Sequence, residues 1–381
     1  MGLCDFDVLT ALPELFFASD LLRIRATVGF ESRTFFHEYS DKEINSPGEP
    51  GVFYFMGVGF AEQPVPDSPP GQVLAGMLDK SHERNRALID RINSKLSGLA
   101  VDYEHDVLPM TPAANATERH IVKAYHDKAL EEMGDDRRQA ALFWASNLGV
   151  ASDKVAALSN DTNALVSFLR SKLIKKGGLG YEQPTEHTFP PLDDVIHMIL
   201  TCGAIPTSTW LDGTSPGESD PDTQLDCLID KGVAAVNIIP DRNWNIDDAD
   251  ERGRKIRELQ RYASTAIAKD LPIIVGTELN KPGQRFVDDF TAEPLKPFAP
   301  AFLEGTRVVI GHTRLLHYAN FSYTGRQARD AYPQPADRNK AFAAVGALPA
   351  PDDNTRQKMT DMLPPKAFDY LQDCAKTGSW S

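Results

Sequence analysis

Cysteine is scarce in this chain of 381 residues. The four cysteines, Cys4, Cys202, Cys227 and Cys374, lie far apart and form no CxxC pair. A disulfide framework or a zinc knuckle needs clustered cysteines, so this spacing argues against both and favours a reducing compartment. No apolar run approaches the roughly 20 residues that span a bilayer, and no basic segment followed by an apolar one opens the chain. We therefore expect a cytoplasmic protein with no membrane partner.

An excess of basic residues is also absent. The chain has 40 Lys and Arg against 54 Asp and Glu, a formal net charge of -14, and a pI near 5.1. A surface for nucleic acid or anionic lipid needs the opposite balance, so both partners are disfavoured. There is no GxGxxG or GKS/T phosphate loop and no internal repeat. A small-molecule ligand is the partner that we expect, and the oligomeric state stays open.

Strand-like and helix-like segments alternate in two parts of the chain, residues 1–73 and 190–290. The first part predicts a short strand, a helix near residues 9–22, a strand at 25–30 and a third strand in "VFYFMGVGF". In the second part, apolar strands such as "AAVNII" and "LPIIV" follow amphipathic helices. Such alternation predicts an α/β fold with a parallel sheet or barrel, in which ligands bind at the strand ends.

Two further parts differ from this pattern. Residues 74–189 carry helical periods rich in Arg, Lys, Glu and Ala, which predicts a helical insertion. Residues 291–381 are less regular and contain proline clusters, so we predict a C-terminal helical extension with one strand-like stretch, "TRVVIGH", at 306–312.

Polar residues stand at four predicted strand ends. They occur in "CDFD", "GFES", "TSTWLDG" and "GTELNK", and they bring acids from separate strands toward one edge. Facing carboxylates bind a hard or borderline cation, or divide general acid and base work because each shifts the pKa of the other. Each residue taken singly also suits a cap for the helix that follows.

The order of these motifs resembles the polymerase and histidinol phosphatase (PHP) superfamily, in particular its bacterial metal-dependent phosphoesterases with a helical insertion. "CDFD" is similar to the family's "TDHD" strand, "GFES" to its "GxE" strand, and "VFYFMGVGF" to its "HILGY" strand. "ERHIVKAY" resembles its "RPHIA" helix start, "CGAIPTSTW" its "GGVAVLAHP" strand, and "IVGTELNK" its "GSDFH" strand. The resemblance covers residues 1–282 and implies a distorted (β/α) PHP-like barrel.

The resemblance also implies a metal site, most of whose histidines are replaced here. Family members hold two or three metal ions that activate water for attack on a phosphate ester. Phe6, Tyr54 and Thr209 stand where the family has metal-binding histidines. The resemblance starts at the family's second strand, so the HxH strand either lies upstream of Met1 or is missing. The implied metal site is therefore reduced to one divalent ion (Mn, Zn or Mg) or to none. The candidate metal ligands are Asp5, Asp7, Glu31 and Glu278.

Catalytic and substrate-binding candidates follow from the same motifs. The candidate catalytic carboxylates are Glu31, Glu278 and Asp212. His120 matches a family histidine of a substrate-phosphate site, and "TERH" also suits an N-cap at Thr117 and a first helical turn whose free N–H groups attract anions. The alternative for His120 is a surface histidine on an amphipathic helix. Trp210 fits a stacking floor for a ligand or ordinary aromatic packing. The substrate-binding candidates together are His120, Arg119, Thr209, Trp210, Asn280 and Lys281.

Two functions remain open at this point, beside a structural role that only the missing metal ligands favour. The first is a divergent PHP-like protein that binds, and in one version turns over, a small polar ligand such as a sugar or a phosphorylated metabolite. The second is a metal-dependent phosphoesterase, a hydrolase, with a reduced metal site. Metal content and the effect of a chelator distinguish the two.

Overall fold

The computed structural model describes residues 1–158, 161–277, 279 and 284–380. These residues form two compact units. The first unit holds Met1–Ala75 and the described residues from Phe189 onward, and the second holds Gly76–Thr188. The apolar cluster of the second unit runs from Leu88 to Ile174 and contains no residue of the first.

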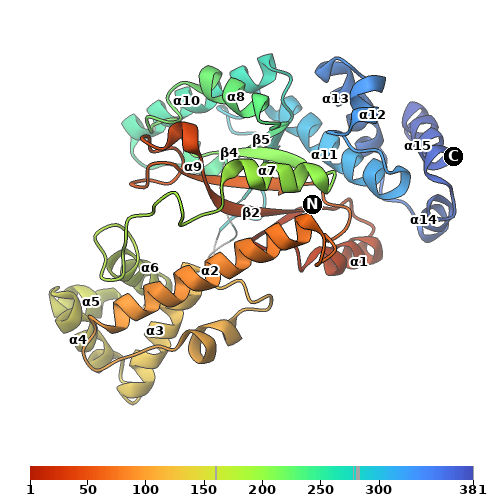
Figure 1. Cartoon of the computed structure of the whole chain (residues 1–381). Coiled ribbons are helices and arrows are strands. Elements are labelled where there is room, and N and C mark those ends of the chain that lie inside the picture. The colour runs from red at the N-terminus through yellow and green to blue at the C-terminus, as the bar shows by residue number, and fades with distance from the viewer. Residues whose placement is uncertain (159–160, 278, 280–283, 381) are drawn as a thin grey trace. The chain divides into compact units, whose positions relative to one another are not determined.

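The first unit is built on a curled six-stranded sheet in the order β1-β2-β3-β4-β5-β6 (Figure 1). Neighbouring strands pair in parallel except for β3, which runs antiparallel to both β2 and β4. The strands are β1 (Gly2–Phe6), β2 (Thr27–Phe35), β3 (Val52–Val58), β4 (Ile205–Trp210), β5 (Ala235–Ile238) and β6 (Ile273–Val275). The predicted mixed α/β class is confirmed.

The reversed direction of β3 corrects the expectation of a fully parallel sheet. A parallel connection needs a crossover, usually through a helix. The segment between β2 and β3 holds only the short 3-10 helix His37–Tyr39, so the chain turns back, and Phe35 pairs with Val52. As a result, β3 begins at the edge of the sheet where the other strands end.

The two faces of the sheet are covered differently. On one face, Trp210, Val236 and Ile273 pack in an apolar cluster with residues of α10, and Gly57 lies against Ile199 of α7. The helices that connect or flank these strands are α1 (Leu12–Leu22), α7 (Leu192–Thr201), α8 (Pro221–Asp230), α9 (Asp241–Trp244) and α10 (Ala249–Ala268).

The opposite face carries α11 (Ala299–Ala319). Met56 and Val58 of β3 pack with Val308 and Val309 of this helix. The remaining helices of the first unit are α12 (Arg326–Ala331), α13 (Pro335–Ala347), α14 (Asp353–Thr360) and α15 (Pro364–Thr377). The predicted strand at 306–312 is therefore wrong. This apolar run is part of a 21-residue helix that is buried on several sides. A helix buried in this way lacks the alternation of apolar and polar residues by which a helix is told from a strand in the sequence.

The second unit is helical. Helix α2 (Pro69–Asn93) crosses the boundary between the units, and a π-turn (Tyr103–Val107) and a 3-10 turn (Leu108–Met110) follow it. The other helices are α3 (Glu118–Glu132), α4 (Arg137–Leu148), α5 (Ser152–Leu158) and α6 (Thr162–Leu173). Large buried side chains such as Trp144, Tyr125 and Leu169 form its core.

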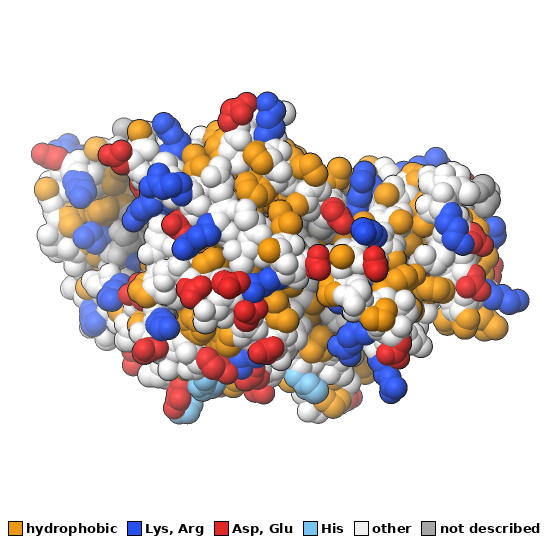
Figure 2. All heavy atoms as spheres, turned by 90° about the horizontal axis from the view of Figure 1, so that it is seen from above, with side chains coloured by type: hydrophobic (Ala, Val, Ile, Leu, Met, Phe, Trp, Pro, Cys, Tyr) orange, Lys and Arg blue, Asp and Glu red, His pale blue; other side chains and the backbone are white. Residues whose placement is uncertain are grey.

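Charges of both signs are mixed on the surface. Figure 2 shows Asp and Glu side chains interspersed with Lys and Arg side chains over the face that it draws. Many of these charges pair, as in the ion pairs of Lys269 with Asp222 and Asp226. Among the described residues, no helix combines the length and the hydropathy needed to cross a bilayer.

Candidate functional site

Four adjacent strands place polar side chains in one row on the face of the sheet that carries α11. Arg33 of β2 pairs with Tyr54 of β3, and Thr209 of β4 pairs with Asn237 of β5. The pairing of Phe55 with Ser208 brings Tyr54 beside Thr209. Directly paired residues point to the same face of a sheet, so all four side chains lie together. We call Arg33, Tyr54, Thr209 and Asn237 the polar row.

Alternation along the strands determines what lies around this row. Glu31 is two residues before Arg33 in β2, so its side chain lies on the same face of the sheet as the polar row. It pairs with Met56, which packs on α11. Phe6 pairs with Glu31, and its ring lies 6.4 Å from that of Tyr54. Met56 and Val58 of this face pack on α11, and the polar row lies beyond them.

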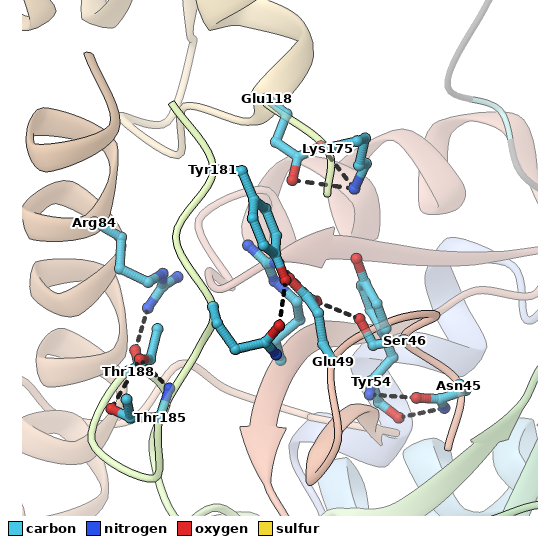
Figure 3. A network of polar contacts seen from close by, with 12 residues as sticks. Asn45, Ser46, Glu49, Tyr54, Arg84, Glu118, Lys175, Tyr181, Thr185 and Thr188 are labelled. Atoms are coloured by element: carbon cyan, nitrogen blue, oxygen red, sulfur yellow. Dashed lines mark hydrogen bonds and ion pairs between the residues drawn. The ribbon is translucent and has the colours of Figure 1, made fainter. Parts of the chain in front are cut away.

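Asn45 holds the middle of the row in place (Figure 3). Its Oδ1 accepts a hydrogen bond from the backbone N–H of Tyr54 at 2.8 Å, and its Nδ2 donates to the backbone oxygens of Tyr54 and Thr209, each at 3.1 Å. The same Nδ2 lies 2.8 Å from Oγ1 of Thr209, which donates to the Tyr54 oxygen. Asn45 and the Thr209 hydroxyl therefore serve mainly to fix β3 against β4.

Arg33 is the cation of the row. Its Nη1 lies 3.7 Å from Oε2 of Glu49, and its guanidinium lies 4.5 Å from the centre of the Phe189 ring. Ser46 donates a hydrogen bond of 2.6 Å to Glu49, a contact also drawn in Figure 3. The side chain of Arg33 is 16% exposed. A guanidinium held over a ring and paired with a carboxylate has less freedom to reorient, as recognition of a phosphate or carboxylate requires.

Asp5 and Asp7 do not join Glu31 on this face. Asp5 alternates with Phe6 along β1 and so points to the opposite face, where burial raises its pKa. Asp7 is buried in a left-handed conformation with φ 62°, and its Oδ1 accepts a hydrogen bond of 2.5 Å from Ser32. Ser32 also alternates with Glu31, so the predicted metal ligands of β1 and β2 lie on different faces.

The residues predicted at the end of β4 and in the loop after it have separate surroundings. Trp210 lies on the face opposite the polar row and stacks on Tyr262 with ring centres 4.9 Å apart. Asp212 pairs with Lys255 at 3.2 Å and accepts two hydrogen bonds from Thr214. Burial favours a raised pKa for Asp212, but the bonds from Thr214 and Lys255 outweigh it and hold the pKa below its usual value. Thr209 is the one member of this group in the polar row.

Glu218 organises the loop that contains Asp212. Its buried carboxylate accepts hydrogen bonds from the backbone N–H groups of Leu211, Asp212 and Gly213 at 2.8, 3.1 and 2.9 Å. Burial raises the pKa of Glu218 to about 7, against the opposing effect of these three bonds. Sequence analysis did not select this residue, because nothing in "GTSPGESD" shows that the loop folds around its own glutamate.

His120 and Arg119 lie in the second unit, in the first turn of α3. The Nδ1 of His120 accepts a hydrogen bond of 3.1 Å from the backbone N–H of the N-cap residue Thr117, which completes a capping box. The predicted N-cap at Thr117 is thus confirmed. Burial lowers the pKa of His120. Beside it, Glu118 pairs with Lys175 (Figure 3). Glu118 also pairs with Arg170 of the same unit.

The remaining predicted residues, Glu278, Asn280 and Lys281, lie outside the described part of the chain. Within the part that is described, no group of three or more His, Cys, Asp or Glu residues is arranged to hold a metal ion. The metal set and the catalytic set therefore remain predictions.

Arg33, Asn237 and Asn45 were missed by sequence analysis. Arg33 follows Glu31 by two residues in "GFESRTF", a spacing that puts both charges on one face of a strand. Asn237 is a lone polar residue in the apolar strand "AAVNII", where its amide needs a partner. Both signals are readable in the sequence. Asn45 carries no such signal, because its role depends on two strands that are distant along the chain.

No family model and no curated protein matches this chain. The likeness to solved structures is weak. An amidohydrolase from Chromobacterium violaceum, with bound sulfate and no metal, is 14% identical with a TM-score of 0.44 and covers 74% of this chain and 77% of its own. A candidate metal-dependent phosphoesterase from Bifidobacterium adolescentis is 14% identical with a TM-score of 0.42 and covers 79% of this chain and 85% of its own. Likeness at this level decides neither family nor activity.

Proposed function

We propose that the polar row binds a small phosphorylated metabolite such as a sugar phosphate. The observation that carries this proposal is the convergence of Arg33, Tyr54 and Asn237 from three strands onto one face, with Glu31 beside them. A few placed polar groups gathered on one face are typical of a site for a small polar ligand. The row spans three strand spacings, or about 14 Å, which is enough for a sugar ring and its phosphate.

Each side chain has a chemical role in this proposal. Arg33 binds the phosphate through parallel N–H donors, since guanidinium and phosphate match in geometry. Glu31 accepts hydrogen bonds from sugar hydroxyls, and Asn237 offers both a donor and an acceptor. Asn45 keeps the row in position and contacts no ligand itself. If the ligand is turned over, Glu31 is the carboxylate available for acid or base chemistry on this face.

Calorimetric titration of the whole protein tests the proposal with ribose 5-phosphate, glucose 6-phosphate, glucose and inorganic phosphate. We expect the sugar phosphates to bind more tightly than glucose or phosphate alone. Arg33→Gln should weaken binding at least tenfold, and Arg33→Lys should weaken it less because it keeps the charge. Arg326→Gln is the matched control, since Arg326 is exposed on α12. Absence of binding by any compound, or equal affinity in Arg33→Gln, would overturn the proposal.

Metal removal separates this proposal from metal-dependent hydrolysis. Arg33 places a positive charge in the row, which opposes a divalent cation at the same position. We expect the affinity for sugar phosphates to be the same before and after dialysis against EDTA. Loss of binding that returns with Mn, Zn or Mg would instead favour the phosphoesterase with a reduced metal site. The metal content of the purified protein provides an independent measurement.

A further inference from the structure

Helix α1 carries apolar side chains on its outer face as well as on its buried one. Leu12 and Leu15 are buried in the first unit. On the other side of the helix, Pro13, Phe17 and Leu21 follow one another at intervals of four residues and so form one stripe. Phe17 is 72% exposed and Leu21 is 75% exposed. A helix that is apolar all round is normally covered on all sides, so the exposed stripe indicates a partner.

Further exposed apolar side chains extend the stripe at the C-terminal end of α1. Leu22 is 65% exposed, Ile24 is 37% exposed and Met1 is 48% exposed. The backbone N–H of Ile24 donates to the oxygen of Ser19, and the amino group of Met1 donates to the oxygen of Arg25 at 2.6 Å, so both residues lie at this end of the helix. Apolar residues gathered in this way indicate an interaction site, whereas scattered ones do not. We call this group the α1 patch, and it consists of Pro13, Phe17, Leu21, Leu22, Ile24 and Met1.

The charges beside the α1 patch have opposite signs at its two ends. Glu14 lies in the first turn of α1 and Arg23 is the C-cap residue, and both are exposed. Their midpoint along the helix nearly coincides with the midpoint between Phe17 and Leu21. In two copies of α1 packed antiparallel about a two-fold axis, Phe17 of each copy therefore meets Leu21 of the other. The same arrangement brings Glu14 of each copy to Arg23 of the other, and the antiparallel helix dipoles also attract.

The charge balance favours a second copy of the chain over a membrane surface. A helix that lies on an anionic membrane carries several Lys and Arg residues along its polar face. Helix α1 has Glu14 and Asp20 there, with Arg23 as the one cation at its end, and the net charge of the chain is -14. These acids repel an anionic lipid surface, whereas the pairing of Glu14 with Arg23 suits a second copy.

We propose that the α1 patch is the interface through which two copies of this chain form a two-fold dimer with their α1 helices antiparallel. A standard interface takes about 20–30 residues from each partner, and α1 has 11 residues. The dissociation constant should therefore be on the order of 10 µM. The interface is separate from the polar row and does not depend on the function proposed for that row.

Sedimentation equilibrium of the whole protein from about 1 to about 100 µM tests the proposal. The average mass should rise from the 42.0 kDa of one chain toward twice that value. Phe17→Ala should raise the dissociation constant at least about thirtyfold, as expected for an aromatic side chain at the centre of an interface. Its unfolding midpoint should stay unchanged, because Phe17 is exposed in the single chain.

Leu303→Ala is the matched control and should leave the dissociation constant unchanged. Leu303 is an exposed apolar residue of α11, 49% exposed. Gly305, two residues later, lies against β6, which is the strand at the opposite edge of the sheet from β1. A mass of 42.0 kDa for the wild type at every concentration would overturn the proposal. Dimers that Phe17→Ala leaves intact would overturn it as well, because they would use another surface.

Charge reversal tests the antiparallel arrangement. Glu14→Arg and Arg23→Glu should each raise the dissociation constant about tenfold, because the two-fold axis repeats every like-charge contact. An equimolar mixture of the two variants should associate as tightly as the wild type, since in the mixed dimer each introduced charge meets an opposite charge. A mixture no tighter than the single variants would overturn this arrangement. Binding of the wild type to vesicles of phosphatidylserine and phosphatidylcholine, lost in Phe17→Ala, would assign the patch to a membrane instead.

Discussion

Individual buried side chains decide how the loops at the sheet edge are held. Glu218 is the clearest case, because one carboxylate accepts three consecutive backbone N–H groups after β4. Asn45 acts in the same way on the other side of β4, where its amide bonds to Tyr54 and Thr209. In both cases a polar side chain supplies hydrogen bonds to backbone groups at this edge of the sheet.

Glu218→Gln should change how stability depends on pH. The pKa of Glu218 is about 7 in the folded state and near 4.5 in the unfolded state, so the folded protein favours the protonated carboxyl. The contribution of this group to the free energy of unfolding is therefore fully present below pH 4.5 and is lost as the pH rises through 7. The difference in unfolding free energy between wild type and Glu218→Gln should therefore fall by about 3 kcal/mol from pH 4.5 to 8. Urea denaturation across this range measures it. Glu304→Gln, exposed on α11, should show no such change, and parallel pH profiles for wild type and Glu218→Gln would contradict the assignment.

At the scale of elements, the close packing of α11 on α13 depends on glycine. A Cβ atom added at Gly311 would lie 1.9 Å from the backbone oxygen of Phe342, and one at Gly346 would lie 1.8 Å from that of Arg307. The two backbones can therefore approach as they do only without these side chains. His312 adds a link from α11 to the sheet through the oxygen of Gly59 at 3.0 Å.

Gly311→Ala should destabilise the first unit by at least about 3 kcal/mol, because the contact is with backbone and cannot be relieved by a rotamer change. Gly253→Ala on α10 is the matched control. Its added Cβ would meet only the end of the Arg257 side chain at 3.6 Å, so we expect a gain of about 0.5–1 kcal/mol from helix propensity. Chemical denaturation measures the change in unfolding free energy for both variants. Equal changes would show that α11 and α13 can move apart to accommodate the added methyl group.

At the scale of the whole molecule, each unit has an apolar core of its own. The core of the second unit is drawn from residues between Leu88 and Ile174, and the clusters around α10 and α11 contain none of them. Cores that share no residues can open independently. The sheet that carries the polar row therefore has a core that the second unit does not share.

Calorimetry should resolve two unfolding transitions, one for each unit. Leu169→Ala, in the core of the second unit, should lower one transition, and Phe342→Ala, in the core of the first, should lower the other. Each substitution should cost about 2–5 kcal/mol, as expected for a large buried side chain. A single transition that shifts with both variants would show that the units unfold as one.

The local order of helices and strands was readable from the sequence, because amphipathic periods and short apolar runs reflect which face of each element is buried. The helical periods within residues 74–189 and the N-cap at Thr117 were readable in this way. The direction of β3 did not, since it depends on the path of a loop without a crossover helix, and the helix at 306–312 did not, since a run that is apolar on all sides has no period. The polar row is likewise a property of the tertiary structure. Arg33, Tyr54 and Asn237 are far apart along the chain, and only the register between strands brings them onto one face.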